Sequence, residues 1–246
     1  MGTQTLALVG AAGGAGTTRL AVECGATLAR AGRDVAVLDA AFATQGLADY
    51  VVERIDADTT AVATGDADLD AALYDCPVDT PGRLSLAPAR APFERLARAK
   101  TAGAAERFEK HVAAAALSHD AVLVDTPPVA ANQAVAAVTA AERVAVVTPD
   151  TPRGGDALAR ARGRLADVGA DLDAVVANFA GEEVVVREAD ARVPESPTTA
   201  PAACPACVPP DERFAPAVAA ATEAALGTAL DLSFPESGRL DGLLDR

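Results

Sequence analysis

The sequence predicts a three-layer α/β domain with a doubly wound, mostly parallel sheet and helices on both faces. Short apolar runs alternate with helical segments along most of the 246 residues, a pattern typical of parallel strands joined by right-handed crossovers. Half of the residues are hydrophobic but only 3% are aromatic, so Val, Leu and Ala must build the core, as in a parallel sheet covered by Ala-rich helices. We expect one domain over residues 1–230 and a tail over 231–246.

The elements of the first half follow from apolar runs and the residues that bound them. Leu6–Val9 is predicted to be a buried strand. A glycine-rich turn separates it from a predicted helix over Thr18–Ala31, which Gly32 ends. We expect two further strands, at Val35–Asp39 and Arg83–Ala87. We also expect a short helix in the polar region, at Asp68–Asp75, and a mostly helical stretch at Pro92–Leu117.

The second half alternates more regularly between the two kinds of element. Three runs rich in Ala and Val are predicted to be strands: Ala121–Asp125, Arg143–Thr148 and Asp173–Asn178. Three segments are predicted to be helical: Asn132–Thr139, Gly155–Val168 and Asp211–Leu226. Between the last strand and the last helix, residues 188–203 are rich in Pro, Thr and Ala and are predicted to form a loop or insertion.

The charge of the chain limits its partners. The formal net charge is −14, and Lys100 and Lys110 are the only lysines among 21 basic residues. Such an acidic, lysine-poor composition is typical of proteins from halophilic organisms. We expect the source to be a halophilic archaeon. This composition disfavours direct binding to nucleic acid or to an anionic membrane, since both need basic patches. The N-terminus has no charged segment typical of a signal peptide, and no apolar stretch approaches the roughly 20 residues that span a bilayer. We expect a cytoplasmic protein.

A glycine-rich stretch, GAAGGAGTTRL over Gly10–Leu20, follows the first strand and opens the first helix. The backbone N–H groups of such a turn and the positive end of the helix bind phosphate. Glycines at this place also permit close packing of strand on helix, which is the alternative interpretation. Asp39 and Asp125 follow two further strands, where carboxylates hold a hydrated Mg²⁺ beside a phosphate loop. Alternatively, each Asp caps the turn that follows its strand.

In its order of motifs the chain resembles the MinD/ParA group of P-loop ATPases. The resemblance covers residues 3–178 through the glycine loop, VAVLD, AVLVDTPP, RVAVVTPDTPRGGDAL and DAVVAN. It implies nucleotide contacts from Gly13, Gly14, Ala15, Gly16, Thr17, Thr18, Asp125 and Asn178. It further implies that Thr18 and Asp125 hold Mg²⁺, that Asp39 positions or activates the attacking water, and that Asn178 hydrogen-bonds the adenine of ATP or ADP.

The loop departs from the family at both of its lysines. The family sequence Gly-Lys-Gly-Gly-x-Gly-Lys-Thr falls on AAGGAGTT here, so Ala12 and Thr17 replace the lysines. The second lysine offsets charge on the β- and γ-phosphates, and losing such a contact costs about 3–4 kcal/mol of transition-state stabilisation. Arg19, just after the loop, is expected to point away from the phosphates. We therefore expect at most weak ATP hydrolysis.

These observations favour a nucleotide-binding protein with a degenerate loop, acting in positioning, partitioning or regulation. Its partner is expected to be an unidentified protein, a second copy, or an active homologue in a heterodimer. The alternative is a scaffold of the same fold that does not bind nucleotide.

Cys204-Pro-Ala-Cys207 resembles the CPxC motif of Mrp-type iron–sulfur carriers, which gives a third alternative. One such pair supplies two thiolates, so a cluster or zinc ion needs a dimer or other ligands. We expect instead that the pair belongs to a strand leading into Val208. In the tail, Leu240, Leu243 and Leu244 share a helical face, but balanced charges predict packing on the body rather than membrane attachment.

Overall fold

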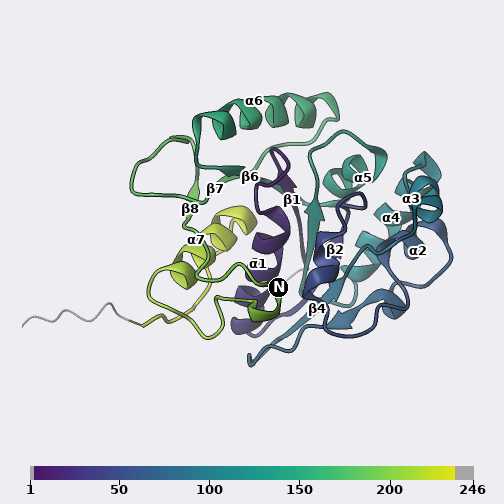
Figure 1. Ribbon diagram of the computed structural model, residues 1–246, viewed down its shortest axis with the longest axis horizontal. Coiled ribbons are helices and arrows are strands. Elements are labelled where there is room, and N and C mark those ends of the chain that lie inside the picture. The colour runs from purple at the N-terminus through teal and green to yellow at the C-terminus, as the bar shows by residue number, and fades with distance from the viewer. Residues whose placement is uncertain (1–2, 236–246) are drawn as a thin grey trace, which may run out of the picture.

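Eight strands form one sheet in the computed structural model, which describes residues 3–235 (Figure 1). The order is β3-β4-β2-β5-β1-β6-β7-β8, and every pairing is parallel except that of β3 with β4. The strands are β1 (Gln4–Gly10), β2 (Asp34–Asp39), β3 (Tyr74–Asp75), β4 (Arg83–Ala87), β5 (Ala121–Thr126), β6 (Arg143–Pro149), β7 (Ala174–Asn178) and β8 (Ala191–Val193).

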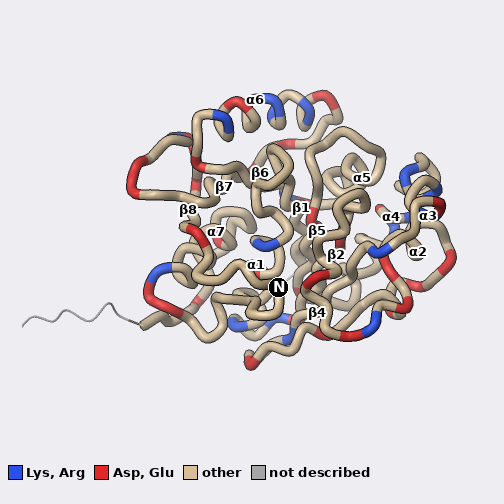
Figure 2. The backbone as a smooth tube through the Cα atoms, viewed as in Figure 1, with Lys and Arg blue, Asp and Glu red and all other residues tan. Residues whose placement is uncertain are grey.

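Helices cover both faces of this sheet, which confirms the predicted fold class. On one face lie α1 (Thr17–Arg30) and α7 (Phe214–Leu226). On the other lie α2 (Thr59–Thr64), α3 (Phe93–Ala99), α4 (Ala102–Ala115), α5 (Asn132–Ala140) and α6 (Pro152–Asp167). Asp and Glu are spread over the loops around the molecule, and basic segments line α6 (Figure 2).

The central strand β1 is buried on both faces, which is why residues 6–9 are all apolar. Leu6 and Leu8 pack against α1 and α7, while Ala7 and Val9 pack on the opposite side. Each face of the sheet therefore has its own core, and the two cores fix the end of β1, where the glycine loop begins.

The prediction of a helix at Asp68–Asp75 is wrong. A helix, α2, lies earlier in the polar region because Asp58 caps it, accepting hydrogen bonds from the N–H groups of Thr60 and Ala61. Gly65 ends α2 with a φ of 80°. Residues 70–72 form one 3₁₀ turn and β3 follows it.

Other boundaries also differ from the prediction. The single helical stretch at Pro92–Leu117 is divided into α3 and α4, because Thr101 caps a new helix by accepting from the Ala104 N–H. The segment 188–203 contains the short strand β8, held to β7 by backbone pairing. Asp211 precedes α7 rather than opening it, and its carboxylate accepts from the N–H of Ala215.

Within residues 3–235 no helix combines the length and the apolar character that a bilayer crossing requires. The predicted packing of Leu240, Leu243 and Leu244 lies outside the described residues.

Candidate functional site

The glycine loop joins β1 to α1 and opens into a cavity. Gly14 and Gly16 have φ angles of 77° and 80°, which side chains rarely adopt. A Cβ added at Gly13 or Gly14 would meet no atom within 4 Å, whereas one at Gly16 would lie 2.3 Å from Nδ2 of Asn178. The loop therefore leaves open space on one side and contacts the end of β7 on the other.

Backbone donors of the helix end face this loop. The first hydrogen bond of α1 runs from the N–H of Leu20 to the carbonyl of Gly16. The N–H groups of Gly16, Thr17 and Thr18 have no acceptor among the described residues, and no side chain caps the helix. Free N–H groups at a helix N-terminus form a site for an anion such as phosphate.

The cavity at the loop has a volume of about 330 Å³. It brings together most of the predicted site residues, since its lining includes Gly13, Gly14, Ala15, Gly16, Thr17, Thr18 and Asp125. The lining also includes Tyr50, from the 3₁₀ turn η1 (Gly46–Tyr50). Asp39 and Asn178 do not line it, and both are buried beside it. We call this space the phosphate cavity.

Two carboxylates lie side by side at the carboxyl ends of β2 and β5. Asp39 and Asp125 are paired in the sheet register, and each is at most 1% exposed. Burial and the neighbouring charge of Asp125 raise the pKa of Asp39 to about 8. Burial raises the pKa of Asp125 to about 6, and a hydrogen bond with Thr18 limits the rise. The charged form of Asp39 is thus disfavoured both by burial and by Asp125, and that of Asp125 by burial.

The two carboxylates differ in how they are bonded. Asp39 accepts hydrogen bonds from the N–H groups of Ala41 and Ala89, at 2.7 and 3.2 Å. One oxygen of Asp125, by contrast, has no hydrogen-bond partner among the described residues. A buried, unpaired carboxylate oxygen beside the Thr18 hydroxyl fits a divalent cation, because Mg²⁺ prefers oxygen ligands.

Asn178 connects the end of β7 to the glycine loop. Its Nδ2 donates to the carbonyl of Ala15 at 2.9 Å. This bond holds the side chain at the edge of the loop, between the phosphate cavity and a second cavity.

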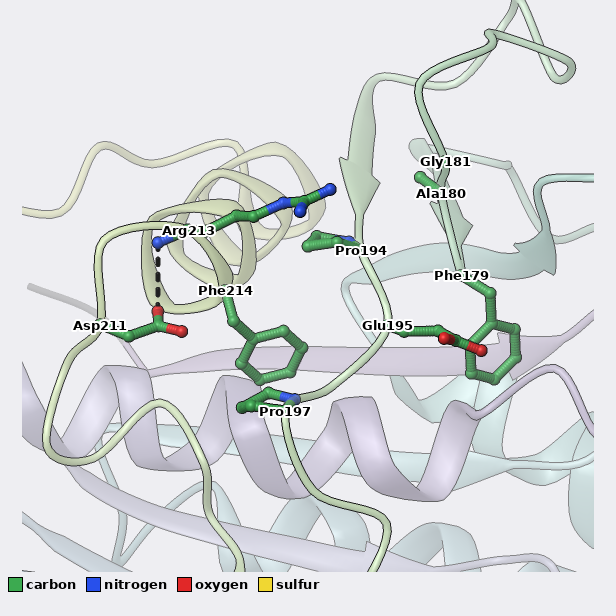
Figure 3. Close-up of a pocket in the computed structure, with 9 residues that line it drawn as sticks. All are labelled: Phe179, Ala180, Gly181, Pro194, Glu195, Pro197, Asp211, Arg213 and Phe214. Carbon is green, nitrogen blue, oxygen red and sulfur yellow. Dashed lines mark hydrogen bonds between the residues drawn. The ribbon is translucent and has the colours of Figure 1, made fainter. Parts of the chain in front are cut away.

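The second cavity, which we call the outer cavity, has a volume of about 430 Å³ and is drawn in Figure 3. Phe179 and Phe214 lie on two of its sides, and Glu195 and Arg213 contribute charged groups to its lining. Phe179 is 43% exposed and has a φ of 57°. A Cβ at Gly16 would lie 2.9 Å from Cζ of Phe179, so the aromatic ring adjoins the phosphate loop.

Sequence reasoning missed the outer cavity. The available signal was an aromatic residue directly after Asn178, in a chain that is only 3% aromatic.

Arg19 lies nearer to the phosphate cavity than the sequence alone indicates. It lines the phosphate cavity. Its guanidinium is turned along α1 to Glu23, with Nε 2.6 Å from a carboxylate oxygen. The guanidinium thus points along α1 and away from the loop, as expected, because Glu23 lies one helical turn further on, although Arg19 lines the cavity.

The strand expected at the cysteine pair is also wrong, since Cys204 and Cys207 lie in a turn. Burial raises the pKa of both thiols. Cys207 is fully buried, and its N–H donates to Glu23 at 2.9 Å. Residues 3–235 contain no group of three or more His, Cys, Asp or Glu side chains placed to hold a metal ion.

The fold is that of the MinD and ParA P-loop NTPase structures. MinD from Pyrococcus horikoshii, solved with Mg-ADP, matches with a TM-score of 0.75 and 20% identity, over 90% of this chain and 95% of that one. MinD in a MinC:MinD complex from Aquifex aeolicus matches with a TM-score of 0.74 and 21% identity, over 94% and 98%. A ParA family ATPase from Chlorobium tepidum matches with a TM-score of 0.66 and 18% identity, over 79% and 86%. No family model and no curated protein sequence matches the chain.

Proposed function

We propose that this protein binds an adenine nucleotide with Mg²⁺ and hydrolyses it weakly or not at all. The observation that carries the proposal is the junction of the two cavities at Gly16. Unpaired N–H groups of Gly16, Thr17 and Thr18 face the phosphate cavity, and the ring of Phe179 adjoins the same glycine. Phosphates fit the first environment and a flat, partly apolar base fits the second.

The proposed metal position is at Thr18 and Asp125. The unpaired buried oxygen of Asp125 and the adjacent hydroxyl of Thr18 supply hard oxygen ligands. A bound Mg²⁺ would neutralise charge on the phosphates. Asp39, buried on the neighbouring strand and fixed by two backbone N–H groups, would accept a hydrogen bond from an attacking water.

Slow chemistry follows from the residues that replace the lysines. Thr17 supplies a hydroxyl to the cavity but no charge, and its Oγ1 lies 2.7 Å from where a Cβ on Gly10 would be. Ala12 supplies neither a charge nor a hydrogen bond. The developing charge on the γ-phosphoryl is thus stabilised by backbone N–H groups and the metal alone, without the lysine of ordinary P-loops.

We infer a role in positioning, partitioning or regulation through another protein. The MinD of Aquifex aeolicus was solved in complex with MinC. This protein would act through a separate protein partner of that kind, as a homodimer, or as a heterodimer with an active homologue. The acidic, lysine-poor composition supports a halophilic source and a cytoplasmic protein that does not bind nucleic acid or membrane directly.

Nucleotide titration tests the proposal. We expect saturable binding of fluorescently labelled ADP and ATP in buffer with Mg²⁺ and molar KCl, and phosphate release close to background. Asp125→Asn should weaken binding in Mg²⁺ but change it little in EDTA.

Two results would contradict the proposal. If neither nucleotide binds up to millimolar concentration, the chain is the scaffold of the alternative interpretation. If Mg²⁺-dependent turnover is fast and Asp39→Ala abolishes it, the assignment of weak hydrolysis is wrong.

A further inference from the structure

Arg19 places a positive charge at the phosphate cavity although the glycine loop has no lysine. Among the described residues that line this cavity, no other is Lys or Arg. The Arg19 side chain is only 16% exposed. Burial would lower the pKa of Arg19, but hydrogen bonding and charge from Glu23 outweigh it, so the pKa is raised. The guanidinium is a permanent cation at the rim of the cavity.

Two side chains hold this guanidinium in one orientation. Nε donates to Glu23 at 2.6 Å, and Nη2 donates to the hydroxyl of Ser196 at 2.5 Å. Glu23 is itself fully buried and accepts hydrogen bonds from the N–H groups of Ala206 and Cys207, at 2.8 and 2.9 Å. Because two backbone N–H groups also donate to the Glu23 carboxylate, its position is fixed independently of Arg19.

Part of the guanidinium remains available to a ligand. An arginine carries five N–H donors, and the bonds to Glu23 and Ser196 use two of them. The other three N–H donors are not engaged by these two partners. The hydroxyl of Tyr50, which also lines the phosphate cavity, lies beside the guanidinium.

The bond to Ser196 also shows on which side of the phosphate cavity Arg19 lies. Ser196 lies between Glu195 and Pro197, which line the outer cavity. Asp125 lies on the wall of the phosphate cavity formed by β5 and the residues after it. Arg19 is therefore held on the side of the phosphate cavity that adjoins the outer cavity.

We propose that Arg19 is the phosphate-binding cation of this site and that it contacts the phosphate nearest the nucleoside. The assignment rests on the proposed function, because it requires a nucleotide whose base occupies the outer cavity. That phosphate is common to nucleoside mono-, di- and triphosphates. A cation there stabilises bound substrate and transition state equally, so it raises affinity without speeding transfer of the γ-phosphoryl group.

The test compares nucleotide affinities of variants by isothermal titration calorimetry, with AMP, ADP and ATP as ligands and Mg²⁺ present for the last two. We expect Arg19→Gln to weaken all three by a similar factor of about 10, equivalent to about 1.4 kcal/mol. Ser196→Ala, which keeps the Arg19–Glu23 pair, should weaken them by a smaller common factor. Arg160→Gln, an exposed arginine on α6 across the sheet, is the matched control and should change nothing.

The folding of each variant is checked separately, since Arg19→Gln leaves the buried Glu23 without its cation. Arg19→Lys keeps a charge near Glu23 but loses the planar fork, and it should lower affinity while retaining more of the thermal stability. Unchanged affinity in a folded Arg19→Gln, or a loss confined to ATP, would overturn the assignment. If the unmodified protein binds no nucleotide at all, the proposed function itself is wrong. That result differs from one in which the unmodified protein binds nucleotide and Arg19→Gln binds it equally well, which contradicts only the role of Arg19.

Discussion

Asp39 and Asp125 face each other across neighbouring parallel strands, buried, and neither forms an ion pair with a residue of the described chain. In ordinary P-loop proteins a loop lysine lies near such carboxylates. Here the pair is balanced only by backbone N–H groups and by whatever cation the site binds.

This pair predicts that the protein without metal loses stability as the pH rises. For both residues the pKa is raised in the folded state, to about 8 for Asp39 and about 6 for Asp125, so the folded state binds more protons than the unfolded state above about pH 4. Their contribution is therefore complete below about pH 4 and is lost as the pH rises through about 6 to 8. Urea unfolding in EDTA, measured from pH 5 to 9, checks this. Asp39→Asn should flatten the profile, and an unchanged profile would contradict it.

Magnesium should reverse this loss. A divalent cation at Thr18 and Asp125 favours the charged form of the pair, so millimolar MgCl₂ should raise the melting temperature at pH 8 by several degrees, more than at pH 5. Differential scanning fluorimetry with and without EDTA measures it. Asp125→Asn should remove the effect, while Asp120→Asn, which lies at the opposite end of β5, is the control. An equal shift in both variants would place the metal elsewhere.

Gly16 and Gly13 should respond differently to alanine. Gly16→Ala forces a Cβ to 2.3 Å from Nδ2 of Asn178 and strains a φ of 80°, so it should cost about 1–3 kcal/mol of stability and abolish nucleotide binding. Gly13→Ala meets no atom within 4 Å and should fold normally. Chemical denaturation and labelled-ADP titration compare the two. Equal behaviour would mean that the loop is not held by Asn178.

Returning a lysine to the loop should restore chemistry. Thr17→Lys places an ammonium at the position of the second loop lysine in the MinD/ParA group, which the sequence resembles, and phosphate release from ATP should rise by about 10-fold or more. A Thr17→Met variant of similar length without charge is the control. If the lysine variant stays as slow as the parent, some defect other than the missing charge limits hydrolysis.

The sequence predicted the parts of the site that follow directly from strands. The glycine loop, Asp39, Asp125 and Asn178 each come after an apolar run, and the carboxyl ends of parallel strands meet at one edge of a sheet. Local pattern is sufficient for these residues.

The parts that depend on packing between distant segments could not be predicted. The second partner that fixes the Arg19 guanidinium is Ser196, which lies 177 residues away in the chain. The outer cavity joins Phe179 to a segment without strong periodicity, and the turn at Cys207 is held by a hydrogen bond to Glu23, 184 residues earlier in the chain. The helix expected at 68–75 was displaced by Asp58, because capping chemistry outweighed a weak periodic pattern.

The buried carboxylate of Glu23 also bears on the order in which the chain folds. Its hydrogen bonds reach Ala206 and Cys207, 183 and 184 residues further along. Until those residues leave the ribosome, α1 would bury a carboxylate without two of its donors, at a free-energy cost. The helix that carries the loop therefore becomes stable only after Cys207 has been synthesised, and a chain truncated before Ala206 should fail to form a stable loop. The stability of the first helix thus depends on a turn more than 180 residues further along the chain.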